Sequence, residues 1–141
     1  MTRALAIDYG KRRIGVAYSD PDQVIVSHRE TIIISGYRDA VRKLVDYIRR
    51  SEAGEIVIGY PYRQDSSPGP LADEVNKLCS RLRERFPEIP IELLDERYTS
   101  LLAIRYMHQN GMKVGDDKGR VDSTAAGILL EEYINRKRGD E

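Results

Sequence analysis

The sequence predicts a single α/β domain in which helices cover both faces of a mixed β-sheet. The first part of the chain contains three short apolar segments joined by turn-forming residues, a pattern typical of an antiparallel meander. The second part alternates apolar runs with amphipathic segments, which is typical of parallel strands joined by helical crossovers. With 141 residues, 40% of them hydrophobic, the chain suits one buried core, and we expect one domain over 1–141.

The meander is predicted from β-branched and aromatic residues between short polar joints. We expect strands over Ala4–Asp8, Arg13–Ser19 and His28–Ile34. The joint Tyr9-Gly10-Lys11 and the joint Ser19-Asp20-Pro21-Asp22 contain the residues that turns prefer. Both joints are short enough to connect antiparallel neighbours.

The next elements alternate between helix and strand. Apolar residues on one face predict a helix from about Arg38 to Arg50, which we expect Ser35 to help cap. A strand over Glu55–Tyr60, a helix over Leu71–Phe86 and a strand over Ile89–Leu94 then form a parallel crossover unit. Parallel strands place their carboxyl ends at one edge of the sheet, where ligand sites gather.

Two more helices complete the prediction. One is expected from Ser100 to Asn110, with a cap at Thr99 or Ser100 and an end at Gly111. The charged, glycine-containing segment Lys113–Gly119 is expected to form a loop. The last helix is expected over Ser123–Lys137.

The charge composition argues against a protein that coats nucleic acid indiscriminately. Lys plus Arg and Asp plus Glu both number 23, so the net charge is zero and any nucleic-acid surface has to be local. Basic clusters on helices are expected to be solvated outer faces balanced by nearby glutamates. Lys11-Arg12-Arg13 differs, because it directly follows Asp8-Tyr9-Gly10.

Several other classes of site are not supported. Cys79, the single cysteine, falls in an apolar row and is expected to be buried. His28 and His108 lack partners at zinc-ligand spacing, and neither a nucleophile elbow nor a Walker glycine loop is present. The apolar stretch near the N-terminus is too short for a signal peptide or a membrane span, so we expect a cytoplasmic protein without a membrane partner.

Three acidic residues stand at the edges of predicted buried elements: Asp8, Glu96 and Asp122. Each has an ordinary structural interpretation as well. Asp8 can belong to a hairpin turn, Glu96 can pair with Arg97 beside a helix cap, and Asp122 can interact with a helix dipole. If the three converge, however, their burial requires cations, most simply a hard divalent metal bound through oxygen.

Four segments, taken in order, resemble the YqgF family, also called RuvX, of nucleases with the ribonuclease H-like fold. The segments are Ala6-Ile7-Asp8-Tyr9-Gly10 through Arg13-Ile14-Gly15-Val16-Ala17, Val57-Ile58-Gly59-Tyr60-Pro61 with Gly69 beyond it, Asp95-Glu96-Arg97-Tyr98-Thr99, and Lys118-Gly119-Arg120-Val121-Asp122-Ser123 with Ala125-Ala126 and Ile128-Leu129-Leu130. The resemblance covers nearly the whole chain. It implies a five-stranded mixed sheet, with a three-strand antiparallel meander, parallel strands and helices on both faces.

The resemblance also implies a site. Asp8, Glu96 and Asp122 match the acidic positions of the family and would be the catalytic, metal-binding residues, which favours Glu96 over its neighbour Asp95. The cofactor would be Mg²⁺ or Mn²⁺, with two ions about 4 Å apart activating a water and stabilising the leaving oxygen.

Phosphate contacts are assigned to four basic residues. Lys11, Arg12 and Arg97 are expected to bind phosphates of a nucleic acid, and Arg63 in the loop Tyr62–Pro70 is expected to help clamp the strand. Contacts of this kind position the substrate and carry no sequence information by themselves.

At position 119 this chain differs from many proteins of the wider fold. Relatives in that fold often carry a fourth acid one helical turn before the last, whereas this chain has Gly119. Three carboxylates would hold two ions only when a substrate phosphate completes the shell. We therefore expect weak metal occupancy without substrate.

The implied activity is endonucleolytic hydrolysis of phosphodiesters, and processing of the pre-16S rRNA end in ribosome biogenesis is favoured, with a ribosomal precursor particle as partner. The first alternative is a Holliday junction resolvase in DNA recombination and repair. Structured RNA is favoured over four-way-junction DNA because symmetric junction cutting needs two active sites and hence a dimer, and the sequence identifies no dimer face. A monomer and a homodimer both remain open.

Two further alternatives come from other classes of protein. A non-catalytic RNA-binding assembly module would keep the fold without turnover, although all three acids are retained. The opening Ile7-Asp8-Tyr9-Gly10 also resembles the first phosphate loop of actin-like ATPases and sugar kinases. Those enzymes use a second such loop in a second domain, which this chain lacks, so this alternative ranks last.

Overall fold

The computed structural model describes residues 2–61, 69–95 and 121–139, with the side chains of the last segment described from residue 125. The strands are β1 (Arg3–Tyr9), β2 (Arg13–Ser19), β3 (Val26–Ile33), β4 (Ala53–Tyr60) and β5 (Ile91–Asp95). The helices are α1 (Tyr37–Ser51), α2 (Ala72–Arg85) and α4 (Val121–Gly139). The predicted helix Ser100–Asn110 and the predicted loop Lys113–Gly119 lie outside the described residues.

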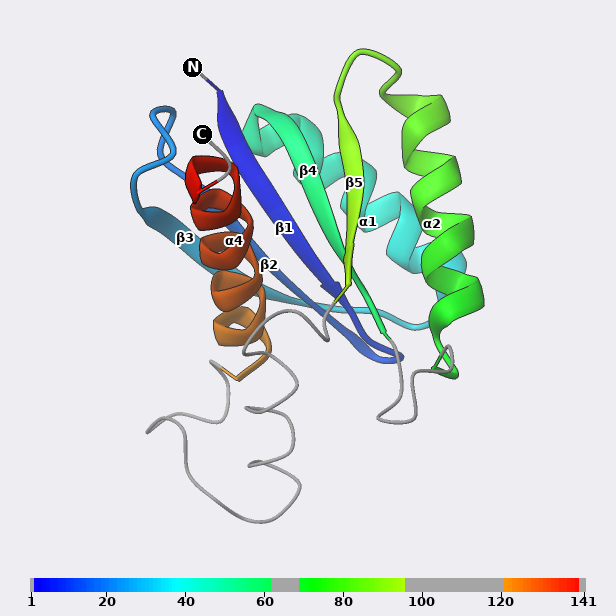
Figure 1. Ribbon diagram of the computed structural model, residues 1–141. Helices are drawn as coiled ribbons and strands as arrows, with labels where there is room; N and C mark the ends of the chain where they lie inside the picture. Colours follow the sequence, from blue (N-terminus) through cyan, green and yellow to red (C-terminus); the bar gives the residue numbers. More distant parts are fainter. Residues whose placement is uncertain (1, 62–68, 96–120, 140–141) are drawn as a thin grey trace.

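The five strands form one mixed sheet in the order β3-β2-β1-β4-β5 (Figure 1). Strand β2 pairs antiparallel with both β1 and β3, which confirms the predicted meander. Strand β4 pairs parallel with both β1 and β5, so the second half of the sheet is parallel as predicted. The carboxyl ends of β1, β4 and β5 therefore lie at one edge of the sheet.

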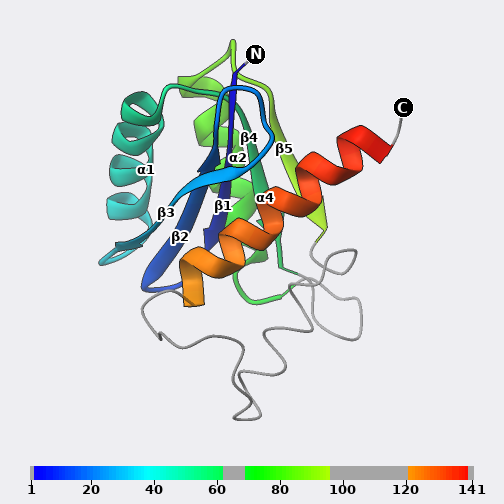
Figure 2. The same ribbon diagram turned by 90° about the vertical axis from the view of Figure 1, so that its left-hand side faces the viewer.

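Helices cover both faces of the sheet (Figures 1 and 2). Helices α1 and α2 pack with Leu5, Ile7, Ile56 and Ile58 in the larger core cluster. Helix α4 packs on the opposite face, with Ala4, Ala6, Ala17 and Val57. This division follows from strand geometry, because successive side chains of a strand point to opposite faces.

Small side chains on the sheet allow α4 to pack closely against it. Ala4, Ala6 and Ala17 are fully buried beneath the helix, with Leu129 and Leu130 above them.

The C-terminal turn of α4 is fixed by polar contacts at the other end of the sheet. Lys137 Nζ donates a hydrogen bond to Gln23 Oε1 at 2.9 Å and pairs with Glu55, and Arg138 donates to the Gln23 carbonyl at 2.8 Å.

The predicted element boundaries are correct to within about two residues, with one exception at a cap. The N-cap of α1 is Gly36 and makes no side-chain hydrogen bond, so the prediction of a Ser35 cap is wrong. Instead, the Ser35 backbone N–H donates to the Asp39 carboxylate at 2.9 Å. This bond, together with Arg42 and Lys43, lowers the pKa of Asp39 to about 2.

The cysteine matches a further expectation. Cys79 is buried on the inner face of α2, and burial raises the pKa of its thiol. No described helix is both long enough and apolar enough to cross a bilayer.

The turn between β1 and β2 depends on Gly10. A Cβ at this position would lie 2.5 Å from the Arg13 carbonyl oxygen, a backbone atom that cannot move without disturbing the start of β2. We predict that Gly10→Ala lowers the free energy of unfolding by about 1–3 kcal/mol, the typical cost of inserting a methyl group into a filled space. Chemical denaturation measures this difference.

Gly127 in α4 is the matched control for this prediction. A Cβ there would meet only the Arg29 side chain, with Nε at 2.7 Å, and that flexible group can move away. Alanine also has the higher helix propensity, by about 1 kcal/mol. Gly127→Ala should therefore leave stability unchanged or raise it, and an equal loss in both variants would refute the assigned role of the Arg13 carbonyl.

Candidate functional site

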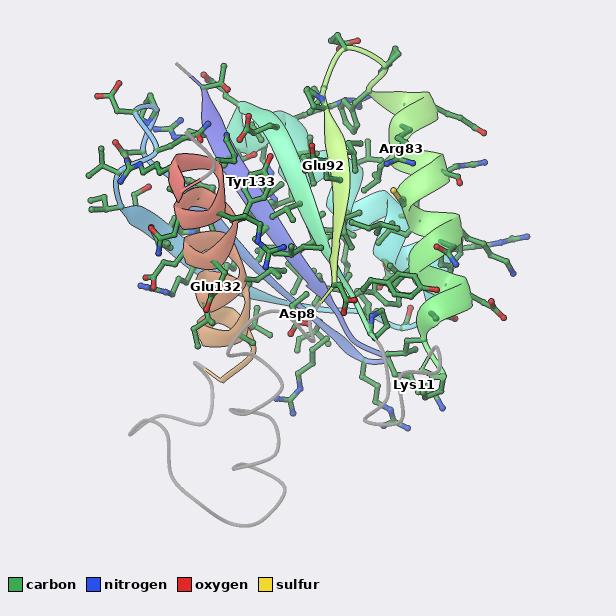
Figure 3. All side chains as sticks on the ribbon, in the orientation of Figure 1. Asp8, Lys11, Arg83, Glu92, Glu132 and Tyr133 are labelled. Carbon is green, nitrogen blue, oxygen red and sulfur yellow. The ribbon has the colours of Figure 1, made fainter. Side chains whose placement is uncertain are left out.

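Asp8 is a buried carboxylate near the carboxyl end of β1. Its residue is only 8% exposed. Ala4 and Ala6, four and two residues earlier, face α4, so strand alternation directs Asp8 toward the same face. Asp8 pairs in register with Gly15 of β2, which has no side chain. Figure 3 shows Asp8 at the end of the sheet where β5 finishes.

The end of β5 lies at the same edge as Asp8. Ile7 pairs with Ile58, and Ile58 pairs with Leu93, so Leu94 and Asp8 occupy equivalent positions along the sheet. Leu94 packs in the cluster beneath α4, which puts Asp95 on the opposite side of the strand. This alternation supports the choice of Glu96 over Asp95, although Glu96 itself lies outside the described residues.

Helix α4 begins at this edge of the sheet (Figures 1 and 2). Its last turn is fixed at the far end by Lys137 and Arg138, so its first turn is directed toward the end of β1. Asp122 belongs to this first turn. The end of β1, the end of β5 and the start of α4 therefore lie at the same edge of the sheet. The side chains of Glu96 and Asp122 are not among the described ones.

A metal-ligand set cannot be complete among the described side chains, because Asp8 is the single described member of the predicted trio. Within residues 2–61, 69–95 and 125–139, no group of three His, Cys, Asp or Glu residues could hold an ion. The assignment of Asp8, Glu96 and Asp122 to a metal therefore remains a prediction. No described ligand set competes with it.

The basic residues Lys11 and Arg12 are exposed and line a cavity of about 440 Å³ at the same edge (Figure 3 labels Lys11). The cavity opens on the side of α1 and α2, and Tyr9, Tyr37 and Glu74 also line it. Arg97 and Arg63, the other predicted phosphate contacts, lie outside the described residues. The ends of the predicted clamp loop are close together, since the Gly69 N–H donates to the Pro61 carbonyl at 2.7 Å.

Tyr9 contacts Glu74, a pair that was not predicted from the sequence. Burial raises the pKa of Tyr9 to about 12, and the charge of Glu74 and a hydrogen bond to its carboxylate add to the effect. Tyr9 follows Asp8 directly, so it points to the opposite face of the sheet, where the first turn of α2 supplies Glu74. Nothing in the sequence indicated this pair, because 64 residues separate its members.

Comparison with known proteins shows one consistent family. A family model described as RuvX, Holliday junction resolvase, matches residues 2–136. A protein of Flavobacterium psychrophilum named "Putative pre-16S rRNA nuclease" is 34% identical over 139 residues, covering 97% of this chain and 99% of the relative. A protein of Azobacteroides pseudotrichonymphae with the same name is 39% identical over 136 residues, covering 95% and 96%.

Two solved structures share the fold over nearly their full length. Thermus thermophilus RuvC in complex with a Holliday junction substrate has a TM-score of 0.59 at 15% identity, and the match covers 97% of this chain and 96% of RuvC. The fowlpox virus resolvase with Holliday junction DNA has a TM-score of 0.55 at 7% identity, covering 93% and 98%. At these identities the likeness establishes the ribonuclease H-like fold alone.

The Tyr9–Glu74 pair can be tested by alkaline titration. In wild type the Tyr9 phenolate should form near pH 12, and in Glu74→Gln its pKa should fall part of the way toward 10, because burial of the phenol remains while the repelling carboxylate is gone. Since the folded-state pKa lies above the unfolded value, the stability contributed by neutral Tyr9 is complete below pH 10 and is lost as pH rises to 12.

The difference between the phenolate absorbance curves of wild type and Tyr9→Phe isolates this one tyrosine. Tyr9→Phe in the Glu74→Gln background serves as the matched reference for the second curve. Superimposable difference curves in the two backgrounds would show that Glu74 does not influence Tyr9.

Proposed function

Because this chain belongs to the RuvX family, we propose that it is a metal-dependent endonuclease that hydrolyses phosphodiester bonds of nucleic acids. The observation that carries the proposal is the burial of Asp8 at the edge where β5 ends and α4 begins. Asp8 thus presents carboxylate oxygen, a ligand of hard divalent cations, where two other elements of the chain end or begin. The catalytic residues are Asp8, Glu96 and Asp122.

The described part of the site fits a hard divalent cation. Asp8 supplies carboxylate oxygen, the donor that Mg²⁺ and Mn²⁺ prefer, and its register partner Gly15 has no side chain. Asp8, Glu96 and Asp122 would hold the ions, which supply an activated water and charge neutralisation at the leaving oxygen. Lys11, Arg12, Arg63 and Arg97 bind the phosphates on either side of the scissile bond.

The preferred substrate is the end of the pre-16S rRNA, processed during ribosome biogenesis in the cytoplasm. The names of the sequence relatives support this choice, since they cover the chain almost completely. Structured RNA within a ribosomal precursor particle is then the partner, and one catalytic site per monomer suffices. A non-catalytic assembly module is disfavoured because all three acids are retained.

Holliday junction resolution is the second candidate. It is supported by the description of the family model, which matches residues 2–136. Symmetric cutting of a four-way junction requires two sites related by a two-fold axis, so this activity needs a homodimer. The two candidates therefore differ in both substrate and oligomeric state.

The nuclease activity gives the first test of the proposed function. The purified protein should cleave a pre-16S rRNA fragment with Mg²⁺ or Mn²⁺, and Asp8→Asn should lower the rate more than about 100-fold, because even groups behind metal ligands change activity by 10–100-fold. Glu96→Gln and Asp122→Asn should behave alike. Gel analysis of end-labelled RNA, generic single strands and a four-way junction measures the rates.

Asp22→Asn is the matched control, because Asp22 is an exposed acid near the C-terminal end of α4, away from Asp8. It should cleave at the wild-type rate. Thermal unfolding of each variant shows that the fold is retained. Cleavage that persists in Asp8→Asn would show a contaminant or a different site, and preferential cutting of the junction by a dimer would favour the second candidate.

Metal binding gives a second test. With three carboxylates and Gly119 in place of a fourth acid, the free protein should bind Mg²⁺ weakly. A cleavage-resistant methylenephosphonate substrate, which keeps both non-bridging phosphate oxygens, should raise the Mg²⁺ affinity by about 5- to 150-fold, the usual range of coupling between two ligands. Calorimetric titration with and without this analogue measures the effect. Two tight sites in the free protein would contradict the expectation.

A further inference from the structure

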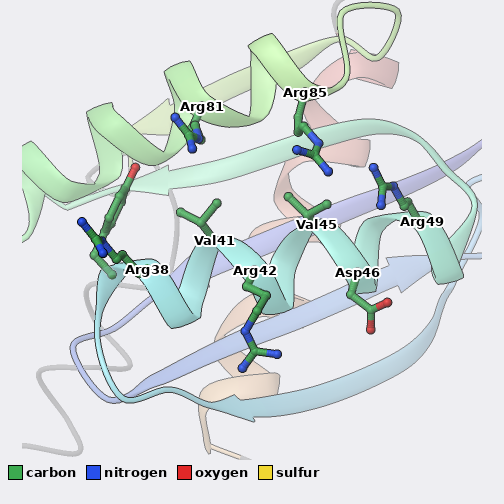
Figure 4. A pocket seen from close by; sticks show the side chains of 9 residues that line it. Arg38, Val41, Arg42, Val45, Asp46, Arg49, Arg81 and Arg85 are labelled. Atoms are coloured by element: carbon green, nitrogen blue, oxygen red, sulfur yellow. The ribbon is translucent and has the colours of Figure 1, made fainter.

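A groove between α1 and α2 carries an excess of positive charge. Its cavity of about 770 Å³ is lined by five arginines, with Arg38, Arg42 and Arg49 on α1 and Arg81 and Arg85 on α2 (Figure 4). Asp46 is the one acidic residue of the lining. The groove lies on the face of the sheet opposite to α4, so it is separate from the side to which Asp8 points.

Most of these guanidinium groups are not used to hold the fold together. Arg42 pairs with Asp39 at 2.6 Å, and Asp46 pairs with Arg50 at 3.0 Å, which leaves the acid of the groove already neutralised. Within the described part of the chain, Arg38, Arg49 and Arg85 form no ion pair or hydrogen bond, and Arg81 has no acidic partner. Their excess charge is exposed and is available to an anionic ligand.

The groove continues into the cavity at the edge of the sheet. Tyr37 lines both the arginine groove and the cavity that contains Lys11 and Arg12. Positive residues therefore occur on both sides of Tyr37, from the turn after Asp8 to the C-terminal part of α1, and among the described residues Glu74 is the one acidic residue that lines the edge cavity. Arg38 and Arg49 are eleven residues apart, which at 1.5 Å per residue corresponds to about 16 Å.

The dimensions and the chemistry favour a phosphodiester backbone as the occupant. About 16 Å spans about five steps of a nucleic-acid duplex, at about 3.4 Å of axis per phosphate of one strand. Arginines on both walls match a regularly charged strand, and guanidinium groups bind phosphate in bidentate fashion. An acidic protein segment offers the same sign of charge, but it would not account for the continuity with Lys11 and Arg12 at the proposed catalytic edge.

We propose that the groove between α1 and α2 binds the backbone of the nucleic-acid substrate several nucleotides away from the scissile phosphate. This inference rests on the proposed nuclease function and deepens it, because it defines the substrate as a polynucleotide that bends around the edge of the sheet. Val41 and Val45 form the apolar floor of the groove and hold the two helices at a fixed separation. The bound strand contacts both faces of the sheet.

The salt dependence of binding tests the inference without catalysis. We compare wild type with R38Q/R81Q/R85Q for binding of a labelled RNA duplex in EDTA, by fluorescence anisotropy at several salt concentrations. Each phosphate contact contributes about 0.9 to the slope of log K against log salt, so the triple variant should lose about 2–3 in slope and bind more weakly. Circular dichroism confirms folding.

The matched control is R29Q/K77Q/R136Q, which removes the same formal charge from exposed positions outside the groove. Its slope of log K against log salt should differ from the wild-type slope by less than about one. If the triple variant does not fold, R49Q/R85Q repeats the test with a smaller change, and its slope should fall by about 2.

The possible failures are distinguishable. If wild-type protein binds no nucleic acid, the proposed function fails together with the inference. If wild type binds and the groove variant matches the control in slope and affinity, the inference alone is overturned. If the groove variant loses affinity for polyglutamate but keeps its affinity for the duplex, the groove belongs to an acidic protein partner, which also overturns the inference.

Discussion

The close packing of α4 against an alanine-lined sheet is the constraint on which the rest of the molecule depends. Ala4, Ala6 and Ala17 provide a flat, fully buried surface, and larger residues there would push the helix away. Contacts of Lys137 with Gln23 and Glu55 fix the position of the helix along the sheet. The first turn of α4 is thereby brought to the carboxyl end of β1, where it can contribute an acid to the same centre as Asp8.

The two faces of the sheet divide the chemistry between them. Asp8 belongs to the face covered by α4, where the catalytic carboxylates are proposed to meet. Tyr9 and the arginine groove belong to the face covered by α1 and α2, where positive charge gathers. Lys11 and Arg12 lie at the edge between the two faces. A substrate that passes over this edge can meet both kinds of group.

The sequence predicted the elements well because their signals are local. β2 has the predicted bounds, and β3 begins at Val26 rather than His28 because the ladder with β2 continues past a register shift.

Long-range features were missed. The Tyr9–Glu74 pair and the gathering of arginines from α1 and α2 depend on how distant segments pack, and the arginines were expected to be balanced by neighbouring glutamates. The prediction of a Ser35 cap failed because Gly36 occupies the N-cap position directly before Tyr37, the first residue of α1. The placement of Asp8 was predictable, since a strand end followed by glycine is a local pattern.

The antiparallel ladder between β1 and β2 limits where residues can be inserted into or deleted from β1. Five consecutive residues, from Leu5 opposite Tyr18 to Tyr9 opposite Ile14, hold the register. A single-residue insertion or deletion within that span would exchange the faces of Asp8 and Tyr9, placing a phenol where the carboxylate belongs. A shift already exists between Arg3 and Ala4 in the pairing with β4, before the ladder begins. Length variation is therefore tolerable at the first residues of the chain and damaging a few positions later.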